Sequence, residues 1–227
     1  MTLPLATVLP ARTGVERATL VRRTYGLVFG GVIVTMVGVV FGMTQPALMQ
    51  AVAAHPFISF IVCLPLPMYL AQRSHRDYPR NVLLTLLGTF ATGVWLSPLI
   101  FVLNASQPGI VGQAGALTLT TFGVLTMYAT FSRRDFSAWG GFFVVGLWVL
   151  IATSLLNLFF RNETASMWIA GSTVFVFGGL LVFDTWRIVR SDQYGPDDYV
   201  PAAIAIYLDV LNLFLAILRL LGGNRRG

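Results

Sequence analysis

Two carboxylates stand out in this sequence because each lies inside a long apolar run. Asp184 follows the segment "GGLLVF", and Asp209 lies near the middle of "YVPAAIAIYLDVLNLFLAIL". The remaining acidic residues fall in the tails or in short polar segments between apolar runs. A charged side chain at the centre of a membrane helix costs roughly 2.5–3.5 kcal/mol on insertion scales. This cost indicates that the two aspartates serve a function.

The spacing of the two aspartates predicts that they meet. The polar segment "SDQYGPDD" between their runs is short, so the two helices should form an antiparallel hairpin. At 1.5 Å per residue, Asp184 and Asp209 lie about 12 Å and about 18 Å from this turn. With modest tilt they reach a similar depth. Asp209 also belongs to a narrow stripe of small and polar residues that is expected to face inward, namely Ala205, Asp209, Asn212 and Ala216.

Adjacent carboxylates in a low-dielectric site do not easily ionise together, so they share a proton. The protonated pair links its two helices through a hydrogen bond. The deprotonated pair repels, or binds a hard cation such as calcium, which prefers oxygen ligands. Asp184 and Asp209 are therefore predicted to form a pH sensor and gate that can also bind calcium. The alternative is that each aspartate separately caps or hydrogen-bonds a neighbouring helix.

The composition is that of an integral membrane protein. Of 227 residues, 56% are hydrophobic and 11% are charged, whereas a soluble domain carries about 25% charged residues. Seven runs approach the roughly 20 apolar residues that a membrane-spanning helix needs. We predict an all-α bundle of seven transmembrane helices within residues 24–221, flanked by an N-terminal tail (1–23) and a C-terminal tail (222–227). The predicted spans are 24–46, 53–72, 81–103, 110–132, 137–160, 166–188 and 199–221.

The second predicted span contains Pro65 and Pro67, which should kink or break it. The first span carries glycines in GxxxG spacing, which is typical of closely packed membrane helices: Gly26 with Gly30 and Gly38 with Gly42.

The basic residues predict the orientation in the membrane. The formal net charge is +6, and every basic residue is arginine. Most arginines fall in the N-terminal tail and in the loops on the same side of the predicted bundle, which places the N-terminus in the cytoplasm by the positive-inside rule. Arg225 and Arg226 in the C-terminal tail argue mildly against an odd number of spans, so a six-span form stays open. Arginines clustered between apolar runs are explained by orientation, which leaves no reason to expect nucleic-acid binding.

Three stretches of the chain resemble the Bax inhibitor-1 family. The segments "LLVFDTWRIVR" and "YVPAAIAIYLDVLNLFLAILRLLGG" are similar to the C-terminal signature of that family. Residues 114–143 are similar to its middle segment, and "GVWLSPLI" in the third predicted span fits as well. The chain is identified on these residues as a bacterial member, with a location in the inner (plasma) membrane as the corresponding expectation.

The resemblance implies a fold, an activity and a site. The fold is a seven-helix bundle in which the last helix is central and wrapped by the other six. The activity is a pH-sensitive calcium leak, with Asp184 and Asp209 as the proton sensor and calcium as the permeant ion, without any other cofactor. A basic residue at the cytoplasmic end of the second span is expected to pair with this site, and the candidates are Arg73, His75 and Arg76.

Three other functions are compatible with the sequence. Some bacterial family members are similar to partners that restrain a membrane-bound ATP-dependent protease, so the chain could be a non-transporting regulator that uses its N-terminal tail. Intramembrane aspartyl proteases also carry aspartates on consecutive helices, but here no glycine flanks Asp209 and no PAL motif follows. A proton-coupled transporter is disfavoured because no repeat relates the two halves. We therefore expect that the protein is not an enzyme.

Overall fold

The structure, a computed structural model, describes residues 14–74 and 76–223. These residues form only helices and their connections, which confirms the all-α prediction. The predicted tail residues 1–13, His75 and residues 224–227 lie outside the described residues. The described helices are α1 (Gly14–Thr44), α2 (Pro46–Ala54), α3 (Pro56–Cys63), α4 (Pro65–Arg73), α5 (Arg80–Ser106), α6 (Ile110–Phe131), α7 (Ser137–Phe160), α8 (Glu163–Val189) and α9 (Tyr199–Gly223).

Six helices, α1 and α5 to α9, are long and apolar enough to cross a membrane. They coincide with the first and the third to seventh predicted spans. The first helix starts earlier than the predicted span, because α1 already begins at Gly14. Part of the segment that the sequence suggested to be a flexible tail is therefore helical, and it carries Arg17, Arg22 and Arg23.

The second predicted span is broken more extensively than expected. The prediction of a break at Pro65 is confirmed, since α3 ends at Cys63 and α4 begins at Pro65. A larger bend of 107° separates α2 from the α3–α4 segment at His55. The predicted span over 53–72 begins close to this turn and otherwise coincides with α3 and α4. The bend is caused by Pro56, because a residue before proline is pushed out of the helical region and His55 has φ −125° and ψ 61°.

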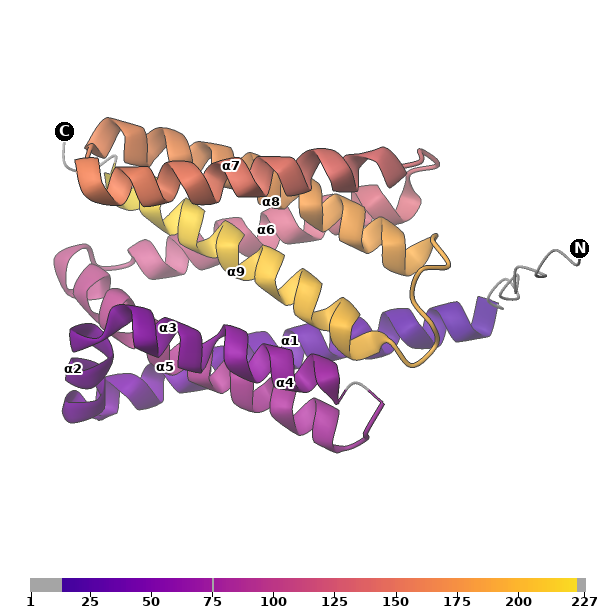
Figure 1. Cartoon of the computed structure of the whole chain (residues 1–227), viewed down its shortest axis with the longest axis horizontal. Helices are drawn as coiled ribbons and strands as arrows, with labels where there is room; N and C mark the ends of the chain where they lie inside the picture. Colours follow the sequence, from indigo (N-terminus) through magenta and orange to yellow (C-terminus); the bar gives the residue numbers. More distant parts are fainter. Residues whose placement is uncertain (1–13, 75, 224–227) are drawn as a thin grey trace, which may run out of the picture.

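The helix α9 runs diagonally through the middle of the bundle, between α7 and α8 on one side and α1 and α3 to α5 on the other (Figure 1). It packs against α1, α4, α5, α6 and α8. The expectation that six helices surround the last one needs a correction. The backbone of α7 comes close to α8 and, among the described residues, not to α9.

The start of α1 and the loops after α4, α6 and α8 lie at the same end of the bundle (Figure 1). The last residue of α9 lies at the opposite end. Most of the arginines belong to the first group of segments, so we call this the arginine-rich end. The uneven distribution of arginines that the sequence predicts is thus also found in the folded bundle.

Among the described helices, α1 and α5 have the most extensive contact with each other, and glycines permit a close approach there. A Cβ placed on Gly38 would strike the Phe90 carbonyl oxygen, and one placed on Gly93 would strike the Thr35 carbonyl oxygen. A Cβ on Gly42 would strike the Ser97 side chain. Small residues at such crossings allow two backbones to approach and gain van der Waals contact. The packing role predicted for Gly38 and Gly42 is confirmed.

Candidate functional site

The two intramembrane aspartates lie together between α8 and α9. Both residues are buried: Asp184 is 8% exposed to solvent and Asp209 is 4% exposed. Their carboxyl groups are within hydrogen-bonding reach of one another. The Oδ2 atom of Asp209 is buried without a hydrogen-bond partner among the described residues. The structure therefore brings together the pair that the hairpin geometry predicted.

Among the described residues, the cation that contacts this pair is Arg187, which lies on the same helix as Asp184. The Arg187 Nη1 donates to Asp184 Oδ1 at 3.0 Å, three residues along α8. The Nε of Arg187 donates to Gln193 Oε1 at 2.8 Å. The guanidinium also lies over the rings of Phe183 and Tyr194, at 5.3 Å and 4.8 Å from their centroids. These contacts hold the charge in place beside Asp184.

The loop between α8 and α9 covers the site at the arginine-rich end. Burial raises the pKa of Tyr194 to about 12, so its hydroxyl stays neutral across the physiological range. The backbone N–H of Gly195 donates to Asp198 Oδ2 at 2.8 Å, which fixes the turn. Two ion pairs tie the loop to α1, Arg17 with Asp192 at 3.5 Å and Arg23 with Asp197 at 3.7 Å. Both are exposed, so each contributes little alone.

Helix α1 also touches α8 next to the carboxyl pair. The hydroxyls of Tyr25 and Thr185 are 3.0 Å apart. Thr185 is fully buried, and it directly follows Asp184 in the chain. Helix α1 therefore contacts both the loop between α8 and α9 and the part of α8 next to Asp184.

Of the basic residues expected at the end of the second span, the two that the structure describes, Arg73 and Arg76, do not contact the aspartates. Arg73 donates from Nε to the Tyr69 hydroxyl at 2.9 Å and stacks on that ring at 5.2 Å. Arg76 lines a cavity between α1 and α5, and His75 lies outside the described residues. Their pairing with the site stays a prediction. The sequence carried a signal for Arg187 that we did not use, since residues three apart on a helix lie on the same face.

The polar stripe on α9 is only partly directed into the core. Ala216 is buried like Asp209, whereas Ala205 and Asn212 are half-buried. The Asn212 side chain donates to the Leu208 carbonyl of its own helix at 2.7 Å. Asn212 is therefore satisfied within α9, as mid-helix polar residues often are.

The donor set of the site does not match a resident calcium ion. Calcium takes six to eight oxygen ligands. Among the described residues, no group of three or more His, Cys, Asp or Glu side chains converges to hold a metal.

Comparison with known proteins shows relatives over most of the chain. A family model described as "Inhibitor of apoptosis-promoting Bax1" matches residues 17–226. The protein "Bax inhibitor 1" of Schizosaccharomyces pombe is 34% identical over 211 residues, which is 91% of this chain and 77% of the yeast protein. An uncharacterized protein of Campylobacter jejuni is 31% identical over 91% of this chain and 89% of its own length. "Protein lifeguard 4" of Mus musculus is 30% identical over 90% of this chain and 85% of its own.

Proposed function

From the premise that the chain belongs to the Bax inhibitor family, we propose that it is a pH-gated calcium leak of the bacterial inner membrane. The proposed topology has seven spans, with the bent α2 to α4 segment as the second and the arginine-rich end in the cytoplasm. The observation that carries the proposal is the buried contact between Asp184 and Asp209. Two carboxyls on neighbouring helices at this depth are costly unless they share a proton.

The charges around the pair assign its two members different roles. Arg187 stabilises the ionised form of Asp184 through a charge-assisted hydrogen bond. Asp209 is more deeply buried and receives no cation among the described residues. Asp209 therefore holds the shared proton, which it donates toward Asp184. The hydrogen bond joins α8 to α9 and keeps the pathway closed.

Loss of this proton leaves two negative charges against one guanidinium. The repulsion acts between α8 and α9, which are held together at this level by the carboxyl contact. Because the proton is bound at low pH and lost as the pH rises, the leak opens on the alkaline side. Calcium, the transported ion, meets the exposed pair of carboxylates only in this state.

A gating role suits the pair better than a catalytic one. A catalytic aspartyl dyad needs both carboxyls free to activate a water molecule. Here Asp184 Oδ1 accepts a hydrogen bond from Arg187 at 3.0 Å. We therefore propose that the protein does not cleave peptides.

The direct test is calcium flux into liposomes that contain the purified protein. We expect flux that rises with pH and is absent from protein-free liposomes. Deleting residues 1–13, which precede α1, should leave this flux unchanged because no residue of the site lies there. Wild-type liposomes without calcium flux at any pH would contradict the channel, and would favour the alternative of a regulator of a membrane protease.

Replacing Arg187 with glutamine should move the pH dependence. Without the neighbouring positive charge the carboxyl pair ionises less readily, so the midpoint of the flux–pH curve should rise by about one pH unit or more. Arg187→Lys keeps the charge and should shift the midpoint much less. Arg190→Gln is the matched control, since Arg190 Nη2 donates to the Thr130 carbonyl and not to the aspartates. An unchanged or lowered midpoint in Arg187→Gln would refute the role of this arginine.

A further inference from the structure

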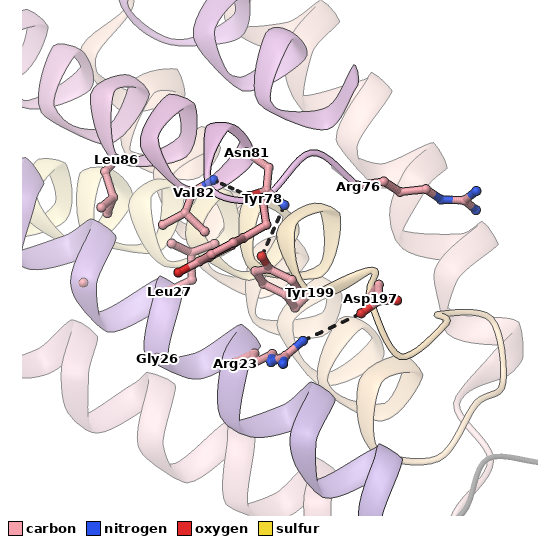
Figure 2. A pocket seen from close by; sticks show the side chains of 11 residues that line it. Arg23, Gly26, Leu27, Arg76, Tyr78, Asn81, Val82, Leu86, Asp197 and Tyr199 are labelled. Atoms are coloured by element: carbon pink, nitrogen blue, oxygen red, sulfur yellow. Dashed lines mark hydrogen bonds and ion pairs between the residues drawn. The ribbon is translucent and has the colours of Figure 1, made fainter. Parts of the chain in front are cut away.

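The cavity that Arg76 lines is at the arginine-rich end, apart from the carboxyl pair. It has a volume of about 720 Å³ and is bordered by α1, the start of α5 and the start of α9 (Figure 2). A single water molecule occupies about 30 Å³ in the liquid. The cavity is therefore large enough for a substantial part of an organic molecule.

The inner wall of the cavity is apolar and contains two glycines that protein packing does not need. A Cβ on Gly26 would meet nothing within 4 Å, and one on Gly30 would meet only Leu86 Cδ2 at 4.0 Å. Gly38 and Gly42, farther along the same helix, have no such room. Helices α1 and α5 thus touch at Gly38 and diverge toward the arginine-rich end. The first GxxxG pair borders the space that this divergence leaves.

The rim of the cavity carries two arginines and one carboxylate. Arg23 lies over the Tyr199 ring at 5.6 Å and pairs with Asp197 at 3.7 Å. The Asp197 side chain is 79% exposed, so water and salt screen this pair. The Arg76 side chain extends outward from the rim (Figure 2), and no ion pair of Arg76 occurs among the described residues. The rim therefore has an excess of positive charge.

Two polar side chains form a rigid wall beneath the rim. Asn81 is 1% exposed, and its Nδ2 donates to the Tyr199 hydroxyl at 3.2 Å. Its Oδ1 accepts from the Val82 backbone N–H at 2.7 Å. Arg23 and Gly30 are seven residues apart on α1, so the polar rim and the apolar inner wall are separated by about 10 Å. This is the order in which the polar and apolar parts of a membrane lipid follow one another.

We propose that this cavity binds an anionic phospholipid. The headgroup phosphate lies at the rim beside Arg23, where Arg76 adds positive charge, and the glycerol and upper acyl chain lie against Gly26, Gly30 and Leu86. Basic pockets between membrane helices on the cytoplasmic side are suited to anionic headgroups. The inference does not depend on calcium transport, because none of these residues contacts Asp184 or Asp209.

Native mass spectrometry of the detergent-purified full chain with equal amounts of phosphatidylglycerol and phosphatidylcholine tests the proposal. Phosphatidylglycerol should be retained preferentially. Each arginine near a membrane surface contributes about 1 kcal/mol, so Arg23→Gln and Arg76→Gln should each lower this preference about fivefold. Arg76→Lys should retain it. Gly26→Leu should reduce the retention of both lipids, because its side chain fills the cavity.

Matched controls separate the site from general effects of charge and size. Arg80→Gln removes one positive charge from the first residue of α5 without lining the cavity, and Gly123→Leu adds a side chain to another open position. Both should bind like the wild type. Equal retention of the two lipids, the same loss in Arg80→Gln, or displacement of the lipid by soluble glycerol 3-phosphate would overturn the assignment to a phospholipid.

Discussion

Replacing Asp209 with asparagine should abolish the pH dependence of calcium flux. Two unit charges about 4 Å apart repel by about 4 kcal/mol at an effective dielectric constant of about 20. Every ~1.4 kcal/mol of this repulsion energy changes an open–closed equilibrium constant about tenfold. An asparagine amide still donates a hydrogen bond to Asp184 but never ionises. We therefore expect a low flux that varies less than about twofold with pH, against about a tenfold or larger rise in the wild type.

Asp184→Asn should have the same direction of effect, because repulsion needs both charges. It also removes the negative charge that Arg187 contacts, so the half-buried guanidinium near Phe183 and Tyr194 loses its ion pair and keeps only a neutral acceptor. Some loss of stability is therefore expected for Asp184→Asn and not for Asp209→Asn, and a thermal unfolding curve of each purified variant would show it. Asp135→Asn, in the loop before α7, is the control for removal of a carboxylate elsewhere. If both intramembrane variants keep the wild-type flux–pH curve, the sensor assignment is wrong.

Replacing Gly93 with leucine should prevent α1 and α5 from packing. A Cβ at this position would already strike the Thr35 carbonyl oxygen, and it would lie 2.9 Å from the Val39 backbone nitrogen. Both obstacles are backbone atoms, which cannot turn away as a side chain does. Overpacking costs roughly 1–3 kcal/mol even where side chains can adjust, so we expect a loss of at least 3 kcal/mol or no folded protein. Unfolding by denaturant in detergent micelles measures this loss.

Gly38→Leu should behave in the same way, because Gly38 faces Gly93 across the crossing. Gly123→Leu is the matched control, since a Cβ there meets nothing within 4 Å. The control should unfold within about 0.5 kcal/mol of the wild type, as substitutions away from packed sites usually do. A Gly93→Leu protein as stable as this control would show that α1 and α5 do not need their close contact.

Much of the helical framework could be predicted from the sequence. Apolar length is a local property, so six of the helices coincide with predicted spans. Proline acts through its own ring and missing N–H, which is why the break before Pro65 was predictable. The bend at His55 lies at the start of the predicted second span, but the separate helix α2 before it was not predicted. Hydropathy alone does not distinguish one bent segment from a straight helix.

The residues of the site also differ in whether a local sequence pattern identifies them. Asp184 and Asp209 stood out because a carboxylate in an apolar run is costly whatever surrounds it. Arg187 as their partner could have been read from its spacing on α8, but the candidates Arg73, His75 and Arg76 were taken from the family resemblance. The structure pairs Asp184 with Arg187 at 3.0 Å, and the pairing of the other candidates stays a prediction.

The sequence by itself determined that this chain is helical, lies in a membrane, carries its positive charge mainly at one end and contains two acids that need a reason to be buried. Only the tertiary structure decided which groups meet. Gly26 with Gly30 and Gly38 with Gly42 have the same spacing, yet a Cβ would strike α5 only at the second pair, because α1 and α5 lie farther apart at the first pair. The cation beside Asp184 and the cavity at Gly26 both depend on the positions of neighbouring helices, which no local pattern in the sequence records.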